Sequence, residues 1–157
     1  MKRMDTKRIT VLIMAAGTGG HVFPALSIAE SLRKQSVNVE WLGTPFGMEN
    51  TLLAATDIPL HQISIKGLRG SGLVRKLTAP FMLCMAFFQS FSVIRHVRPD
   101  CVLGMGGFIC GPAGLAAKLL KKPLLIHEQN AVAGLTNNLL SKVSIKVFEA
   151  FPNTFNK

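Results

Sequence analysis

Short apolar runs alternate with longer mixed segments along this chain, in the order expected of alternating strands and helices. The runs that predict strands lie at residues 9–15, 37–43, 60–65, 100–104, 123–126 and 145–150. Helices are expected to open near Pro24 and to cover residues 48–56, 79–97, 112–120 and 134–142. The first strand is apolar throughout, so helices must cover both of its faces. The pattern therefore predicts an α/β fold: a Rossmann-like parallel sheet with helices on both faces.

A glycine turn follows the first strand directly. It consists of Gly17, Thr18, Gly19 and Gly20, and it ends at His21. Pro24 then suits the first turn of a helix, where its missing N–H costs nothing. Glycine lets the backbone approach a ligand closely, and a helix N-terminus presents free N–H groups with a partial positive charge. We therefore expect a site for a phosphate, a diphosphate or another anion here, although a plain strand-to-helix turn also tolerates glycine.

A second turn repeats this pattern after the fourth strand. Gly104, Gly106 and Gly107 are followed by Phe108 and then by a Pro-Ala pair that opens a helix. The carboxyl ends of parallel strands meet at one edge of a sheet, where open α/β folds bind ligands. The two turns are therefore expected to lie close together and to share one ligand.

Four polar residues follow the fifth strand at the same expected edge. They are His127, Glu128, Gln129 and Asn130. Such a cluster suits hydrogen bonding or acid–base chemistry after a buried strand. A capping role is the simpler alternative, because Asn130 also suits a helix N-cap.

Charge and hydrophobicity point to an anionic partner. The 157 residues are 48% apolar, enough for one folded domain, and carry a formal net charge of +10. No Asp or Glu lies between residues 58 and 99, and the segment 79–97 has no polar face. This apolar run is shorter than the 20 or so residues that cross a bilayer. An apolar surface rimmed by cations suits docking on an anionic membrane, whereas a helix that meets another domain or subunit is the alternative.

The motifs resemble those of a known family. AGTGGHVFPALSIAESL, ISIKGLRG, VLGMGGFICGPAGLAAKL and HEQNAVAGLTNNLLSKV occur in the order seen in the N-terminal half of the MurG family, glycosyltransferase family 28. The resemblance implies a two-domain GT-B fold that transfers N-acetylglucosamine from UDP-N-acetylglucosamine to undecaprenyl-diphospho-muramoyl-pentapeptide in peptidoglycan synthesis. It also implies a peripheral protein on the cytoplasmic face of the bacterial inner membrane.

The resemblance assigns a part to each stretch of the chain. Residues 1–8 are expected to form a basic tail, residues 9–150 the acceptor-binding domain, and residues 151–157 the start of a linker. The donor domain that follows in the family is absent, so we expect a truncated or isolated N-terminal domain that is inactive alone. No metal ion or cofactor is expected, because the chain has no Asp-x-Asp motif.

The same resemblance implies roles for individual residues. The acceptor diphosphate is assigned to Gly17, Thr18, Gly19, Gly20, Gly104, Gly106 and Gly107. The donor sugar is assigned to Thr18, Gly19, Gly20 and Asn130, and the membrane patch to Leu73, Arg75, Lys76, Phe81, Phe87, Phe88 and Arg95. His21 and Glu128 are both candidates for the base that takes a proton from the attacking hydroxyl, as an inverting transfer requires. Two departures occur: Ala16 replaces a common glycine, and Phe108 a common tyrosine.

Other function classes fit less well. A nicotinamide dehydrogenase needs a glycine where Val22 stands, and no Walker loop is present. The charge permits nucleic acid binding, but the chain contains no tyrosine and no base-reading motif occurs, so no nucleic acid partner is expected. A non-catalytic module that binds lipid and membrane is the stronger alternative.

Overall fold

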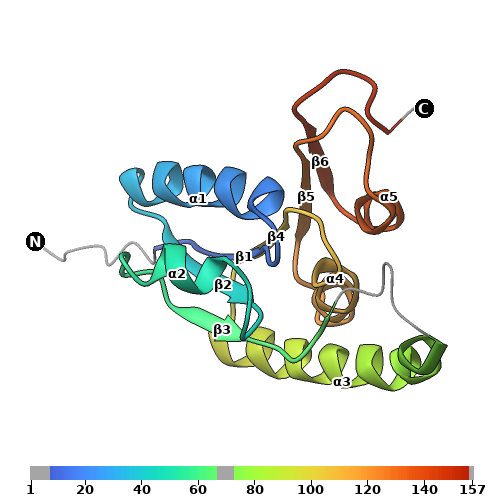
Figure 1. Ribbon diagram of the computed structural model, residues 1–157. Coiled ribbons are helices and arrows are strands. Elements are labelled where there is room, and N and C mark those ends of the chain that lie inside the picture. The colour runs from blue at the N-terminus through green and yellow to red at the C-terminus, as the bar shows by residue number, and fades with distance from the viewer. Residues whose placement is uncertain (1–7, 67–72, 156–157) are drawn as a thin grey trace, which may run out of the picture.

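The computed structural model describes residues 8–66 and 73–155, except for the side chains of residues 73–76 (Figure 1). The strands are β1 (Thr10–Met14), β2 (Asn38–Gly43), β3 (Leu60–Gln62), β4 (Cys101–Gly104), β5 (Leu124–Glu128) and β6 (Lys146–Glu149). The helices are α1 (Gly19–Lys34), α2 (Glu49–Leu53), α3 (Leu73–Val97), α4 (Cys110–Leu119) and α5 (Leu135–Ser141). The predicted α/β class is confirmed.

All strand pairs of the sheet are parallel, in the order β3-β2-β1-β4-β5-β6. The chain builds outward from β1 through β2 to β3, then returns to place β4 on the other side of β1. This reversal creates a topological switch point between β1 and β4, beside which open α/β sheets leave a crevice for ligands. Both glycine turns begin at this point.

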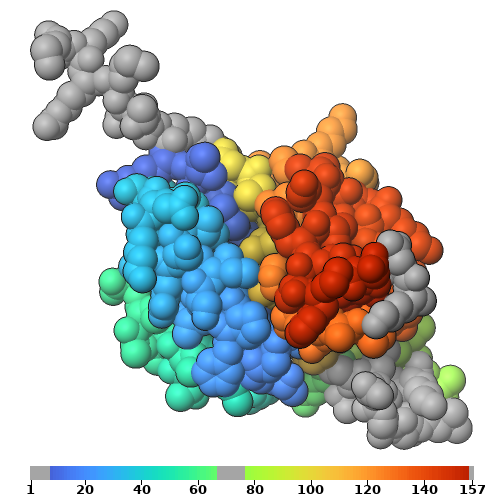
Figure 2. Space-filling view, turned by 90° about the horizontal axis from the view of Figure 1, so that it is seen from above, coloured from blue at the N-terminus to red at the C-terminus, as the bar shows by residue number. Residues whose placement is uncertain are grey.

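The two faces of the sheet pack separate hydrophobic clusters. Along β1, Leu12 and Met14 face one cluster, and Val11 and Ile13 face the other, as the alternation of a strand requires. Helices α3 and α4 cover the first face, and α1 covers the second (Figure 1). Seen from above, α1 in blue lies beside the C-terminal segment in orange and red (Figure 2).

The predicted elements agree with the structure apart from their ends. Pro24 was expected in the first turn of its helix, which is wrong: α1 already begins at Gly19, so Pro24 lies inside the helix. Strand β3 is only three residues long, and β5 continues into His127 and Glu128. The division into tail, domain and linker stays a prediction, although Thr154 is buried against the domain.

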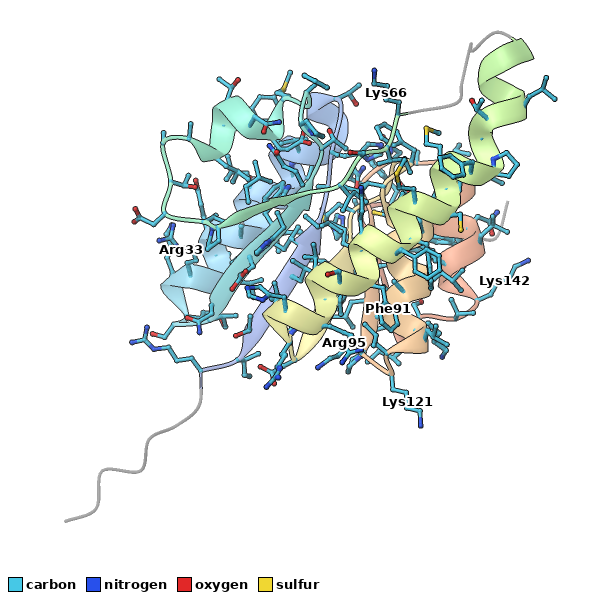
Figure 3. The ribbon with its side chains drawn as sticks, turned by 90° about the horizontal axis from the view of Figure 1, so that it is seen from below. Arg33, Lys66, Phe91, Arg95, Lys121 and Lys142 are labelled. Carbon is cyan, nitrogen blue, oxygen red and sulfur yellow. The ribbon has the colours of Figure 1, made fainter. Side chains whose placement is uncertain are left out.

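Helix α3 is longer than the expected segment 79–97 and lies across the face of the sheet, with Arg95 near its C-terminal end (Figure 3). Its residues Leu77–Val97 have a mean hydropathy of 1.7 and are long and apolar enough to cross a membrane by length and composition. The expectation that the run was too short is thus wrong on this count. A helix that packs on a soluble core can meet the same criteria. Ala86, Ser90 and Ile94 of α3 are indeed buried.

The outward side of α3 carries an exposed apolar stripe, which consists of Leu77, Phe81, Met85 and Phe88. Of the predicted membrane patch, Phe81 and Phe88 are 73% and 64% exposed, and Arg95 is exposed beside the ring of Phe91. Phe87 differs, because it is half-buried and packs against the core. Leu73, Arg75 and Lys76 have side chains outside the described part of the structure.

Candidate functional site

The first glycine turn leads from β1 straight into α1. Gly17 has a φ of +94°, which favours glycine, while Gly19 and Gly20 already belong to the helix. Thr18 is the N-cap residue but forms no side-chain capping bond, and the first turn of α1 contains no acidic residue. The positive end of this helix therefore faces the edge of the sheet without a side-chain counter-charge of its own.

The buried carboxylate of Glu49 stabilises this turn through a hydrogen bond with its backbone. One of its oxygens accepts a hydrogen bond from the N–H of Gly17 at 3.2 Å, and the other accepts from the N–H and the hydroxyl of Thr44 at 2.7 and 2.9 Å. Glu49 is fully buried. The N–H of Gly17 is thus already engaged, so the amides of the turn that remain for a ligand are those that follow it. Glu49 was not predicted, because a lone acidic residue in a short helix gives no signal of such a contact.

The second turn contains two glycines with positive φ and lies deeper than the first. Gly106 and Gly107 have φ values of +97° and +81°, and Gly106 is buried. A methyl group on Gly106 would lie 3.1 Å from both the Asn137 amide and the His21 ring. The second turn therefore packs against His21, and a methyl group between them would require these side chains to shift by a few tenths of an ångström.

His21 joins the two turns. It lies in the first turn of α1, and its Nδ1 lies 3.1 Å from the backbone carbonyl oxygen of Met105 in the second turn. A carbonyl oxygen only accepts, so the proton belongs on Nδ1, and Nε2 keeps its lone pair. The amide of Gln129 lies 2.5 Å from the same Nδ1. The atom placed there is the side-chain nitrogen, which cannot accept the Nδ1 proton, so the contact is favourable only with the amide turned to bring its oxygen, otherwise buried without a partner among the described residues, toward the ring.

Glu128 has a different environment. Its carboxylate is 1% exposed, and each oxygen accepts two hydrogen bonds. The Asn130 N–H and side-chain amide donate to one oxygen at 3.0 and 2.8 Å, and the Gly134 N–H and Asn137 amide donate to the other at 3.1 and 2.8 Å. Burial alone raises the pKa of Glu128, but these four donors outweigh it and leave the pKa below its ordinary value. The carboxylate is therefore ionised, and both of its oxygens already accept hydrogen bonds. This environment suits a residue that stabilises the loop after β5 better than a base that takes a proton from a substrate.

Asn137 links Glu128 to the turns and was not predicted. It is 1% exposed and lies on α5, from which its amide donates to Glu128 and, at 3.1 Å, to the carbonyl of His127. Its own carbonyl oxygen is buried without a partner among the described residues. Asn130, expected near a donor sugar, is exposed at the rim of the site. In the described part of the chain, His, Cys, Asp and Glu form no cluster that would hold a metal ion.

Comparison with known proteins identifies the family. The sequence profile of the glycosyltransferase family 28 N-terminal domain matches residues 11–149. The chain belongs to glycosyltransferase family 28. This family 28 chain is 56% identical, over 95% of its length, to the UDP-N-acetylglucosamine–N-acetylmuramyl-(pentapeptide) pyrophosphoryl-undecaprenol N-acetylglucosamine transferase of Cellvibrio japonicus. It spans only 41% of that relative's length.

Solved structures agree with this assignment. The crystal structure of MurG from Acinetobacter baumannii matches 94% of the family 28 chain, with 56% identity and a TM-score of 0.84, and the match covers 42% of that structure. A putative UDP-N-acetylglucosamine 2-epimerase from Listeria monocytogenes matches with a TM-score of 0.69 at 18% identity, which supports the fold alone. The resemblance to the N-terminal half of GT-B glycosyltransferases is confirmed.

Proposed function

We propose that this chain is the acceptor-binding half of an enzyme that transfers N-acetylglucosamine from UDP-N-acetylglucosamine to undecaprenyl-diphospho-muramoyl-pentapeptide. The names of the relatives include this sugar and this lipid-linked acceptor. The chain spans about 40% of their length, so the donor nucleotide is assigned mainly to a further domain. No resident cofactor enters the proposal.

One observation carries the proposal: two uncapped helix starts and two glycine turns converge at the β1/β4 switch point around a single histidine. Helices α1 and α4 both begin there without a side-chain cap or an acidic residue in the first turn. Two helix N-termini and the backbone N–H groups of the turns favour a ligand with two adjacent negative groups. A diphosphate is such a ligand. The amides from Thr18 to Gly20 would approach it from one side and those of Gly106 and Gly107 from the other, while Gly104 ends β4 and leads into the second turn.

His21 is the proposed base, in preference to Glu128. The Nδ1 proton points to Met105, so the Nε2 lone pair can take the proton of the acceptor sugar hydroxyl. As that O–H bond breaks, the oxygen bonds to the anomeric carbon of N-acetylglucosamine, the bond from this carbon to the diphosphate breaks, and UDP leaves with the electron pair. Attack from the opposite face inverts the anomeric carbon. Glu128 keeps the loop of Gln129 and Asn130 in place.

Helix α3 is the proposed contact with the membrane. Its exposed stripe includes Phe81 and Phe88, and Lys66 and Arg95 lie toward its two ends (Figure 3). Apolar side chains flanked by cations bind an anionic leaflet through both burial and charge. This arrangement would hold the chain on the cytoplasmic face of the inner membrane, where a lipid-linked acceptor is available.

Vesicle flotation tests the membrane contact. Phe81→Glu combined with Phe88→Glu should abolish binding to vesicles that contain anionic phosphatidylglycerol. The matched control is Phe148→Glu with Phe151→Glu, two exposed phenylalanines elsewhere, which should bind as the unaltered chain does. Equal binding by both double variants would remove α3 from the membrane contact.

A transferase assay tests the activity. The chain alone, and the chain joined to the C-terminal domain of the Acinetobacter baumannii MurG, would be incubated with radiolabelled UDP-N-acetylglucosamine and the lipid-diphosphate acceptor. Activity only in the joined protein is the expected result. No activity in a folded joined protein would contradict the proposal and favour a module that only binds lipid.

A further inference from the structure

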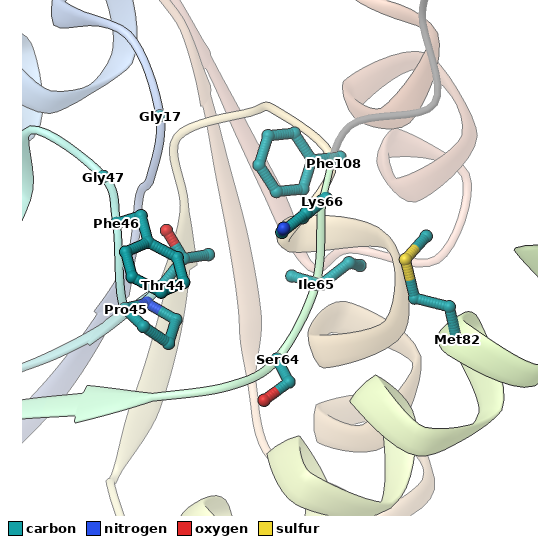
Figure 4. A pocket seen from close by; sticks show the side chains of 10 residues that line it. All are labelled: Gly17, Thr44, Pro45, Phe46, Gly47, Ser64, Ile65, Lys66, Met82 and Phe108. Carbon is teal, nitrogen blue, oxygen red and sulfur yellow. The ribbon is translucent and has the colours of Figure 1, made fainter. Parts of the chain in front are cut away.

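A cavity of about 580 Å³ opens beside the first glycine turn, away from His21 (Figure 4). Phe46 and Pro45 from the β2–α2 loop line one side, Met82 of α3 lines the opposite side, and Ile65 and Phe108 close it. Its volume lies within the range of roughly 300–1,000 Å³ that is usual for small-molecule sites. The proposed transfer reaction assigns no role to this cavity.

The polar groups around the cavity are largely engaged elsewhere. The hydroxyl of Thr44 donates to Glu49 at 2.9 Å, and the N–H of Ser64 donates to the side-chain oxygen of Gln89 at 2.7 Å. Lys66 lies at the cavity with its amine 5.8 Å from the centroid of the Phe46 ring. The walls therefore offer apolar contact and one cation, which suits a hydrocarbon chain that ends in an anionic group.

The cavity adjoins both the first glycine turn and helix α3. Gly17 of the first turn is one of its lining residues, and Met82 lies on α3 next to the exposed Phe81. A lipid whose diphosphate sits at the glycine turns and whose tail enters the membrane beneath α3 must pass between these two points. Phe46 is 88% exposed at this passage, so its ring is accessible to a hydrocarbon chain that passes there.

We infer that this cavity holds the first isoprene units of a polyprenyl diphosphate, with Lys66 beside the phosphate nearer the hydrocarbon. The inference rests on the proposed binding of diphosphate at the glycine turns and adds a subsite for the tail. Phe46, Met82 and Phe108 bind the hydrocarbon, and α3 leads it to the bilayer.

A series of soluble probes tests this inference without a membrane. Isothermal titration calorimetry would compare dimethylallyl, geranyl and farnesyl diphosphate, which share one head group and differ only in the number of isoprene units. We expect farnesyl diphosphate to bind about tenfold or more tightly than dimethylallyl diphosphate, because each further unit buries apolar surface. Phe46→Ser should reduce this ratio to about threefold or less, because it should weaken the binding of farnesyl diphosphate more than that of dimethylallyl diphosphate, whose single isoprene unit buries less apolar surface. Since Phe46 is exposed, the variant should fold normally.

Phe88→Ser is the matched control, because Phe88 is exposed on the outward face of α3 and does not line the cavity. It should keep the full ratio. Equal affinity for all three probes would overturn the hydrocarbon subsite and leave diphosphate binding intact. An equal loss in Phe88→Ser and Phe46→Ser would place the tail on the outside of α3 and also overturn it. If none of the probes binds, the diphosphate site fails together with the subsite.

Discussion

The two glycine turns share a sequence pattern but differ in structure. The first has one residue with positive φ, Gly17, and its other glycines form the exposed start of α1. The second has two such residues, Gly106 and Gly107, and lies beneath the ring of His21. Both turns are proposed to present amides to one ligand, but only the second also lies against the ring of the histidine. A repeated motif therefore predicts a shared edge of the sheet, whereas the additional contact with His21 follows from the fold.

Loss of the histidine between the turns should have the largest effect. In the chain joined to a donor domain, His21→Ala should lower kcat by about 10²–10⁴-fold, because His21 is the proposed base. Affinity for the acceptor should change by less than about threefold, since the proposed contacts with the diphosphate are backbone amides. Steady-state kinetics would measure both values. His96→Ala, at an exposed position on α3, is the control, and a kcat equal to the control's would exclude His21 from the chemistry.

Substitution of Glu128, which stabilises the loop after β5, should have the second-largest effect. Glu128→Gln should lower the free energy of unfolding by about 2–4 kcal/mol at pH 7, because an amide NH₂ would face the donors that now bind a carboxylate. The pKa of Glu128 is depressed on folding, so its stabilisation is complete above the unfolded value near 4.5 and is lost as the pH falls through the folded value. Urea denaturation from pH 7 to pH 3 should therefore show the difference shrink in acid.

The control for Glu128→Gln is Glu30→Gln, which replaces an exposed carboxylate on α1 and should cost little at any pH. A difference for Glu128→Gln that stays constant from pH 7 to pH 3 would contradict the assigned ionisation.

Alanine substitutions separate the two turns directly. Gly106→Ala should destabilise the chain by about 1–3 kcal/mol, since it combines positive φ with contact to His21 and Asn137. Gly20→Ala should be neutral or stabilising by up to about 1 kcal/mol, because Gly20 is helical and nothing closer than 3.9 Å meets the added methyl. Urea denaturation measures both. Equal destabilisation by the two variants would mean that the turns do not differ in the manner described.

Substitution of Cys110, whose thiol contacts the end of β1 and the second turn, should have the smallest effect. Cys110 Sγ lies 3.3 Å from the carbonyl oxygen of Met14 and 3.0 Å from that of Gly106. Burial raises the pKa of this thiol to about 12, so it stays protonated and donates. Cys110→Ala should cost about 1 kcal/mol. Mass spectrometry after alkylation of the native chain at pH 8 should find Cys84 modified and Cys110 unmodified, and rapid modification of Cys110 would contradict its burial.

The sequence predicted what depends on local pattern. Apolar runs located each strand, and glycine after β1 and β4 located the two turns at the carboxyl edge of the sheet, because both follow from backbone preferences of neighbouring residues. The order of the sheet then brought His21 and Glu128 to the same edge. Their separate environments depend on contacts between distant segments, such as that of Asn137 with Glu128, so the sequence left the choice of base open.

Long-range contacts also explain what was missed. Glu49 supports the first turn from a helix 32 residues away, and no spacing rule reveals such a pair. Phe87 looked equivalent to Phe88 in the apolar run. Only the packing of α3 distinguishes them, because one ring faces the core and the other faces outward.

The most direct test of the central claim is a titration of the isotope-labelled chain with inorganic diphosphate, followed by the NMR shifts of backbone amides. The account predicts that Gly19 and Gly20 in the first turn and Gly106 and Gly107 in the second shift together and saturate with one dissociation constant. Shifts confined to surface lysines, or to one turn alone, would contradict a single diphosphate site built from both turns.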